Sequence, residues 1–208
     1  MGVLQSSKVV KARALLEKSH VDLEQFSLGN LVGRITELSA APSAPVLSFI
    51  SLIIREAQAH EEPVVWISAC ESVFFPPDFD ANGVDLDALP VVWAPDLKTA
   101  VRAAEHVLRS NAFGLVVLDL HPHAIIDQGR LGKLARFADL HRVAFLFIAQ
   151  QEKAVSFSLG SIISLRFHSY RSALGENAFQ CVLEACKDKK TAPGWEFSER
   201  FYGPDGLC

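Results

Sequence analysis

The spacing of apolar residues changes several times along the chain, and each change predicts a different element. Between residues 46 and 57 the apolar positions recur at helical spacing, which predicts a helix with one buried side. That side would consist of Val46, Phe49, Ile50, Ile53, Ile54 and Ala57. The continuous apolar run from Val64 to Ile67 is instead typical of a strand buried on both faces of a parallel sheet, and strands are also predicted at Leu115 to Leu120 and Val143 to Ile148.

Two further helical patterns separate these strands. The first has apolar positions at Leu97, Ala100, Val101, Ala104, Val107 and Leu108, and the second at Leu131, Leu134, Ala135 and Ala138. Alternating strands and helices predict an α/β fold with a mainly parallel twisted sheet flanked by helices. After Ser161 strand patterns follow one another, at Ile162 to Phe167, Phe179 to Ala185 and Trp195 to Tyr202. The sheet is therefore expected to end in a β-meander.

The region from Ser72 to Asp87 is predicted to be a loop, because Pro76 and Pro77 do not sustain a helix. Its aromatic residues are expected to pack onto the core more readily than to anchor a partner: Phe74, Phe75 and Phe79. A strand is predicted from Leu89 to Trp93, and Asp96 is expected to cap the helix that follows.

The N-terminal segment from Val3 to Ser19 has the pattern of an amphipathic helix. Lys8 and Lys11 lie on its basic side, and Leu15 belongs to its apolar side. Two interpretations are open: a docking arm for another protein, or a helix folded back on its own core. The segment lacks the unbroken apolar run of a signal peptide, so we expect the chain to stay in the cytoplasm.

The chain has 208 residues, and half of them are apolar. This composition fits a globular protein with a substantial core. The net charge of −4 provides no overall attraction to a polyanion, so any nucleic-acid contact would need a local basic patch. We expect direct DNA binding to be weak or absent. The four cysteines show no zinc-type spacing and are expected to be reduced: Cys70, Cys181, Cys186 and Cys208.

Several segments together resemble the RecA-like recombinase core. They are Gly33 to Leu38 for the first strand, Val64 to Glu71 for the second, Gly114 to Leu120 for the Walker B strand, and Cys186 to Pro193 and Phe201 to Gly206 for the last strands. The resemblance divides the chain into an N-terminal helix and connector at residues 1–25 and a degenerate RecA-like core at residues 26–208. A core of this type without a phosphate loop is similar to the ImuA and SulA group of bacterial SOS proteins.

The resemblance places a degenerate phosphate loop between the first strand and the first core helix. Ala40 stands for the first glycine of the family's loop, Pro45 for the second, Val46 for the lysine and Leu47 for the serine or threonine. Pro45 also has no N–H to offer a phosphate. These replacements predict that the chain binds no ATP, needs no cofactor and is not an enzyme.

Asp119 matches the Walker B carboxylate, whose magnesium would be shared with the hydroxyl now replaced by Leu47. We interpret Asp119 as a relic. The place of the catalytic glutamate is filled by Cys70 or, with a shift of one residue, by Glu71.

His121 and His123 follow the Walker B strand, which invites a metal-binding interpretation. Two histidines around a proline are a weak signal, because a zinc site needs four ligands. The favoured interpretation is that both are polar loop residues and that the chain holds no metal.

Lys187 and Lys189 match lysines that, in the family, reach the ATP bound to an adjacent subunit. The competing interpretation is a solvated turn, since runs of charge are usually exposed faces. Gln150 matches the family's nucleotide-sensing glutamine, but the segment from Gln151 to Leu159 is shorter than the family's DNA loop. DNA binding of the recombinase type is therefore not expected.

The resemblance implies a non-catalytic adaptor in the SOS response and in error-prone translesion DNA synthesis. Its implied partners are a RecA recombinase, an ImuB-type Y-family polymerase-like protein and the error-prone replicative-type polymerase of the same cassette. The interface residues implied for these partners are Lys187, Lys189, Lys8, Lys11 and Leu15. The alternative is a SulA-like inhibitor of cell division that binds FtsZ, and a true ATPase is disfavoured by the lost loop lysine.

Overall fold

The computed structural model describes residues 25–40, 44–69, 74–120, 124–150, 159–175 and 178–202. Its elements follow one another as α2 (Leu28–Leu31), β1 (Ile35–Ala40), α3 (Val46–Ala59), β2 (Val64–Ala69), α4 (Pro76–Ala81), β3 (Val91–Ala94), α5 (Leu97–Ser110), β4 (Leu115–Leu120), α6 (Gln128–Leu140), β5 (Ala144–Gln150), β6 (Leu165–Ala173), β7 (Ala178–Asp188) and β8 (Glu196–Tyr202).

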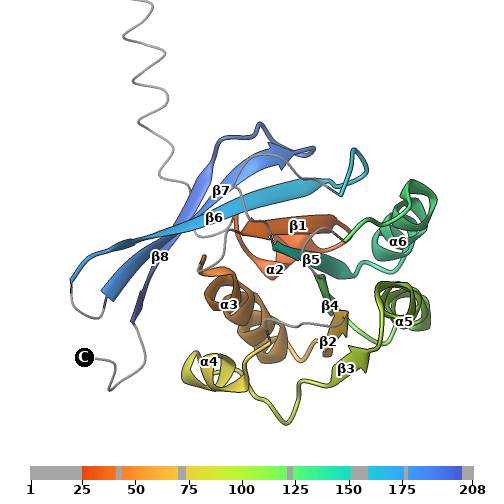
Figure 1. The fold of residues 1–208 in the computed structure, drawn as a ribbon, viewed down its shortest axis with the longest axis horizontal. Coiled ribbons are helices and arrows are strands. Elements are labelled where there is room, and N and C mark those ends of the chain that lie inside the picture. The colour runs from red at the N-terminus through yellow and green to blue at the C-terminus, as the bar shows by residue number, and fades with distance from the viewer. Residues whose placement is uncertain are drawn as a thin grey trace, which may run out of the picture.

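The described strands form one sheet in the order β3-β2-β4-β5-β1-β6-β7-β8. The pairs from β3 to β6 are all parallel, whereas β7 is antiparallel to both β6 and β8. Figure 1 shows the long β6–β7–β8 meander extending beyond the helices that cover the parallel strands. The expected α/β fold, with a mainly parallel sheet that ends in a meander, is confirmed.

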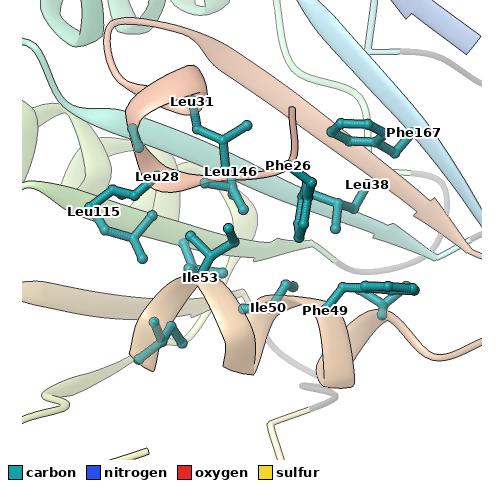
Figure 2. Packing of buried hydrophobic residues seen from close by; sticks show 14 of the residues in the cluster. Phe26, Leu28, Leu31, Leu38, Phe49, Ile50, Ile53, Leu115, Leu146 and Phe167 are labelled. Carbon is teal, nitrogen blue, oxygen red and sulfur yellow. The ribbon is translucent and has the colours of Figure 1, made fainter. Parts of the chain in front are cut away.

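The sheet has a separate apolar core on each face. On one face α2, α3 and α4 pack onto the sheet, and on the other α5 and α6 do so. Figure 2 shows Phe49, Ile50 and Ile53 of α3 directed at the strands. Phe26 fills the space between the helix and the meander, with ring centroids 6.0 Å from Phe49 and 5.4 Å from Phe167. Fully burying such side chains stabilises a fold by about 1.5–3 kcal/mol each.

The helix predicted after the first strand is confirmed, and so is the cap of α5. The Asp96 carboxylate accepts a hydrogen bond from the Thr99 N–H at 2.6 Å, which satisfies one of the first-turn amides of that helix. Strand β4 has the predicted bounds, and all six of its residues, Asp119 included, are buried. Pro45 lies one residue before α3, at its N-cap, and not inside its first turn.

The prediction of a loop through Pro76 and Pro77 was wrong. These prolines begin the short helix α4, where the first positions need no N–H donor. Phe79 of this helix is buried against Trp66, as expected for a core contact, whereas Phe75 is exposed. Proline is therefore compatible with this helix, because it occupies first-turn positions whose N–H groups have no partner within a helix.

Strand β6 begins and ends later than its apolar pattern indicated. Ile162 and Ile163 lie before the strand and pack into the core beside α6. The polar half of β6, through Ala173, continues as a strand because it pairs with β7 along its whole length. No helix in the described part of the chain is long and apolar enough to cross a membrane.

Several expectations concern residues outside those that the structure describes. They include the N-terminal helix with Lys8, Lys11 and Leu15, the residues Cys70, Glu71, His121 and His123, the segment 151–158, and the chain after Tyr202.

Candidate functional site

The turn between β1 and α3 occupies the position expected for a phosphate loop. Ala40 ends the strand, residues 41–43 lie outside the described part, and Val46 begins the helix. The Val46 N–H donates to the Ala44 carbonyl at 2.9 Å, and Pro45 has no N–H. A phosphate needs several backbone N–H groups directed at one point, so this turn has already lost two of them.

The described side chains at the start of α3 are apolar and pack into the core. Val46, which stands where a phosphate loop has its lysine, is 4% exposed and belongs to the core beneath α3. Leu47 is half-buried and packs against the same core. Charged phosphate oxygens placed here would lose their hydration without gaining a cationic partner, which is costly.

Asp119 lies at the carboxyl end of β4, in register with Ser68 of β2 and Ile148 of β5. Because side chains alternate along a strand, Asp119 shares the face of Val117, which is the face that α3 covers. The carboxylate is 1% exposed, and Ser68 is fully buried. This place agrees with that of a Walker B carboxylate, while its role as a relic stays a prediction.

A buried ion pair connects the opposite end of β1 to the meander. Arg34, directly before β1, places its Nη2 atom 2.5 Å from Oδ1 of Asp188, the last residue of β7. The two side chains are 5% and 3% exposed. Arg34 also donates to the Ser164 carbonyl at 3.0 Å, so one guanidinium joins three segments of the chain. Charge-assisted hydrogen bonds of this kind are among the strongest in proteins.

Asp188 organises the turn that follows it. It accepts from the Lys190 N–H at 2.8 Å, from the Thr191 hydroxyl at 2.7 Å and from the Trp195 indole N–H at 3.2 Å. Burial alone would raise the pKa of this carboxyl, but the hydrogen bonds from Thr191 and Lys190 and the Arg34 guanidinium outweigh it and lower the pKa to about 2. The turn is thus organised around an aspartate that is charged at neutral pH.

The two predicted interface lysines flank Asp188 and are held in place by backbone carbonyls. Lys187 Nζ donates to the Ser161 carbonyl at 3.0 Å, and Lys189 Nζ donates to the Ile162 carbonyl at 3.2 Å. We call residues 187–191 the lysine turn. Both acceptors are neutral, and neither ammonium group forms a salt bridge with a carboxylate among the described residues.

Burial lowers the pKa of Lys187, and the nearby charges of Lys189 and Arg166 lower it further, while Glu37 opposes them. The ammonium group is therefore in a locally positive environment. An anionic ligand would relieve this repulsion.

The phosphate-loop position and the lysine turn lie at opposite ends of β1. The Ser164 N–H donates to the carbonyl of Ile35, which begins β1, and the Lys189 N–H donates to the Ser164 carbonyl. The degenerate loop instead follows Ala40, which ends the strand. Five residue steps along a strand span about 17 Å. One nucleotide phosphate therefore does not reach both places within this chain.

Sequence reasoning missed the charged residues of the first strand region. Arg34 and Glu37 are both buried, and Glu37 accepts from the Leu159 N–H at 3.2 Å. The available signal was two charged residues, Arg34 and Glu37, inside a strand that a parallel sheet buries on both faces. It indicates buried partners but not which ones. Among the described residues no group of histidines, cysteines and carboxylates is suited to hold a metal ion.

Comparisons with known proteins support a distant relationship. The chain is similar to "Protein RecA" of Fusobacterium nucleatum subsp. nucleatum, with 28% identity over 176 residues that cover 69% of this chain. The match covers 46% of that protein, so the chain spans less than half the length of this relative. No protein-family model matches the chain. Together with the sheet order and the closing meander, the similarity supports a RecA-like relationship for this chain.

Proposed function

We propose that this chain is a non-catalytic adaptor in the SOS response and in error-prone translesion DNA synthesis. It binds a RecA recombinase and an ImuB-type Y-family polymerase-like protein, and through them works with the error-prone replicative-type polymerase of the same cassette. One observation carries the proposal. At one end of β1 hydrogen bonds hold both lysines of the lysine turn in place. At the other end the described residues of the phosphate-loop position are apolar and pack into the core.

The non-catalytic part of the proposal rests on the turn between β1 and α3. Phosphoryl transfer depends on several parts acting together: backbone amides, a lysine, a magnesium ligand and its second anchor. Here Val46 and Leu47 face the core, and Pro45 lacks an N–H. Asp119 alone supplies one carboxylate and no means to hold a phosphate.

The recombinase-binding part rests on the lysine turn. Lys187 and Lys189 now donate to neutral carbonyls, and a phosphate oxygen of a neighbour's nucleotide is a stronger acceptor because it is charged. The buried pair of Arg34 and Asp188 fixes the backbone between the lysines, which lowers the entropy lost on docking.

In a head-to-tail assembly, each subunit presents one surface that holds a nucleotide and another that contacts the nucleotide of its neighbour. A subunit with only the second surface has a definite place in such an assembly. Head-to-tail growth of a filament needs complementary surfaces on both sides of each subunit. A chain that retains the lysine turn but holds no nucleotide adds to a filament end and does not extend it. In this way it marks a RecA filament end for the polymerase-like partner.

The test is a binding measurement with purified RecA on single-stranded DNA, with and without a slowly hydrolysed ATP analogue. We expect binding to require the analogue. Charge-assisted contacts contribute about 1.5–3 kcal/mol each, so Lys187→Ala combined with Lys189→Ala should weaken binding at least about tenfold. Lys190→Ala is the matched control, because this lysine lies in the same turn and only its backbone N–H holds Asp188.

Equal binding of the double variant and the wild type would contradict docking through the lysine turn, and so would binding that is indifferent to nucleotide. A pull-down from extracts of DNA-damaged cells then separates the partner classes. Recovery of recombinase and polymerase-like protein supports the adaptor, whereas recovery of FtsZ in their place supports a SulA-like inhibitor.

A further inference from the structure

Helices α5 and α6 form a continuous outer layer on one face of the sheet. Helix α5 connects β3 to β4, which lie on either side of β2, and α6 connects the neighbouring strands β4 and β5. All of these strands are parallel, so the two helices run in the same direction. Figure 1 shows them side by side. The Arg109 guanidinium lies 5.9 Å from the centroid of the Phe137 ring, which identifies the side of α5 that meets α6.

The solvent side of this layer is strongly basic. Its exposed cationic side chains are Lys98, Arg102 and Arg109 on α5 and Arg130, Lys133 and Arg136 on α6. We call these six residues the α5–α6 basic face. Residues 98, 102 and 109 fall on one stripe of α5, and those of α6 recur every three residues.

The charge of this face contrasts with the rest of the chain. The two helices carry six lysine or arginine residues against Glu105 and Asp139, a surplus of four positive charges in a chain of net charge −4. None of the six forms an ion pair with a carboxylate in the described part of the chain. The aspartates at the two N-caps, Asp96 and Asp127, are already accepting from backbone N–H groups.

Neighbouring charges on these helices both attract and repel. Glu105 and Asp139 each lie three or four residues from a basic residue and partly neutralise it, whereas Lys133 lies three residues from both Arg130 and Arg136. Because six cations face two carboxylates, a surplus of positive charge is available to an anionic partner.

From this charge and spacing we infer that the α5–α6 basic face binds the phosphodiester backbone of DNA. A protein partner would be expected to find an apolar anchor at the centre of its binding site. Among the described residues the large exposed apolar side chains nearest this face, Ile125 and Leu140, lie before α6 and at its end, and Phe137 between the helices is partly buried. Contacts to phosphates alone carry no sequence information, so the binding is independent of base sequence. The overall net charge of −4 therefore hides a local site for a polyanion.

The test is fluorescence anisotropy of the full chain with labelled DNA, single-stranded and duplex in separate arms, over a series of salt concentrations. We expect binding in at least one arm that weakens with salt. The double charge reversal Arg102→Glu with Lys133→Glu should reduce affinity at least tenfold at low salt. It should also reduce the slope of log affinity against log salt by about two units, because two phosphate contacts are lost.

Two control variants and one replacement variant accompany this test. Arg171→Glu with Arg200→Glu changes the charge equally on the exposed surface of the meander and should retain binding. Arg102→Lys with Lys133→Arg keeps the charge and should bind like the wild type. A variant that fails to match the wild-type thermal unfolding is replaced by Lys98→Gln with Arg136→Gln, for which at least a fivefold loss is expected.

The inference is overturned if the chain binds neither DNA at low salt, or if the charge reversal on the helices weakens binding no more than the reversal on the meander. It is also overturned if Lys8→Ala with Lys11→Ala abolishes binding while the helix variants do not. Displacement of the DNA by an equal charge concentration of polyglutamate would assign the face to an acidic protein instead.

Discussion

The two ends of strand β1 differ in chemistry although one strand positions both. At its carboxyl end the chain passes through Pro45 into α3, and Val46 and Leu47 join the apolar core. At its amino end Arg34 forms a buried ion pair with Asp188, and two lysines flank this pair. The two ends of one strand can thus differ in polarity, because each end is fixed by its own contacts. The amino end depends on charge and the carboxyl end on packing.

The largest expected effect comes from breaking the charged end. Arg34→Met should destabilise the fold by about 3–5 kcal/mol, because it leaves the Asp188 carboxylate buried without its cation. Chemical denaturation measures the change in the free energy of unfolding. Asp80→Asn, which removes an exposed carboxylate from α4, should change it by less than about 0.5 kcal/mol. A small effect of Arg34→Met would mean that the pair does not hold the amino end together.

The packed end is probed by restoring the lysine of a phosphate loop. Val46→Lys should destabilise the fold by about 1–3 kcal/mol, since a polar group enters a buried position. It should not create ATP binding, because Pro45 and the apolar neighbours remain. Denaturation and calorimetry on the same variant measure both quantities. Val46→Leu is the control for size, and gain of nucleotide binding by Val46→Lys would show that the turn is closer to a working loop than its contacts indicate.

A pH series on the wild type and one variant tests the charged end alone. The pKa of Asp188 is depressed from 3.8 to about 2 in the folded protein. A depressed carboxyl pKa adds stability above the unfolded value, and this stability is lost as the pH falls through the folded value. The advantage of the wild type over Asp188→Asn should therefore shrink by at most about 2 kcal/mol between pH 4 and pH 2. A difference that stays constant over this range would contradict the assigned pKa.

The smallest effect is expected for the lysines themselves. Lys187→Ala should change the free energy of unfolding by no more than about 0.5 kcal/mol, because it removes only a hydrogen bond at the surface. This is checked by comparing the thermal unfolding of Lys187→Ala with that of the wild type and of the control variant Lys190→Ala. A loss of several degrees would mean that Lys187 holds the segment after residue 158 in place and is not free to exchange its carbonyl for a phosphate.

The sequence was sufficient for elements with strong periodicity. The spacing of Phe49, Ile50 and Ile53 identifies α3 because a one-sided helix is the only way to bury them together. The continuous apolar run from Val64 to Ile67 likewise identifies β2 as a strand buried on both faces. The helix α4 was missed because Pro76 and Pro77 stop a helix in its interior but not in its first turn.

The contacts of the candidate site were harder to predict. Arg34 and Asp188 are 154 residues apart, and no local pattern connects them. The carbonyls that hold Lys187 and Lys189 belong to Ser161 and Ile162, and backbone acceptors leave no trace in side-chain composition. The basic face also combines residues of two helices, which a net charge for the whole chain conceals.

The central claim is that the carboxyl end of β1 no longer holds a nucleotide, and titration calorimetry of the isolated chain with ATP and Mg²⁺ tests it most directly. RecA titrated under the same conditions provides the positive control. The account predicts no binding heat beyond dilution for the wild type. Stoichiometric binding with micromolar affinity would contradict it.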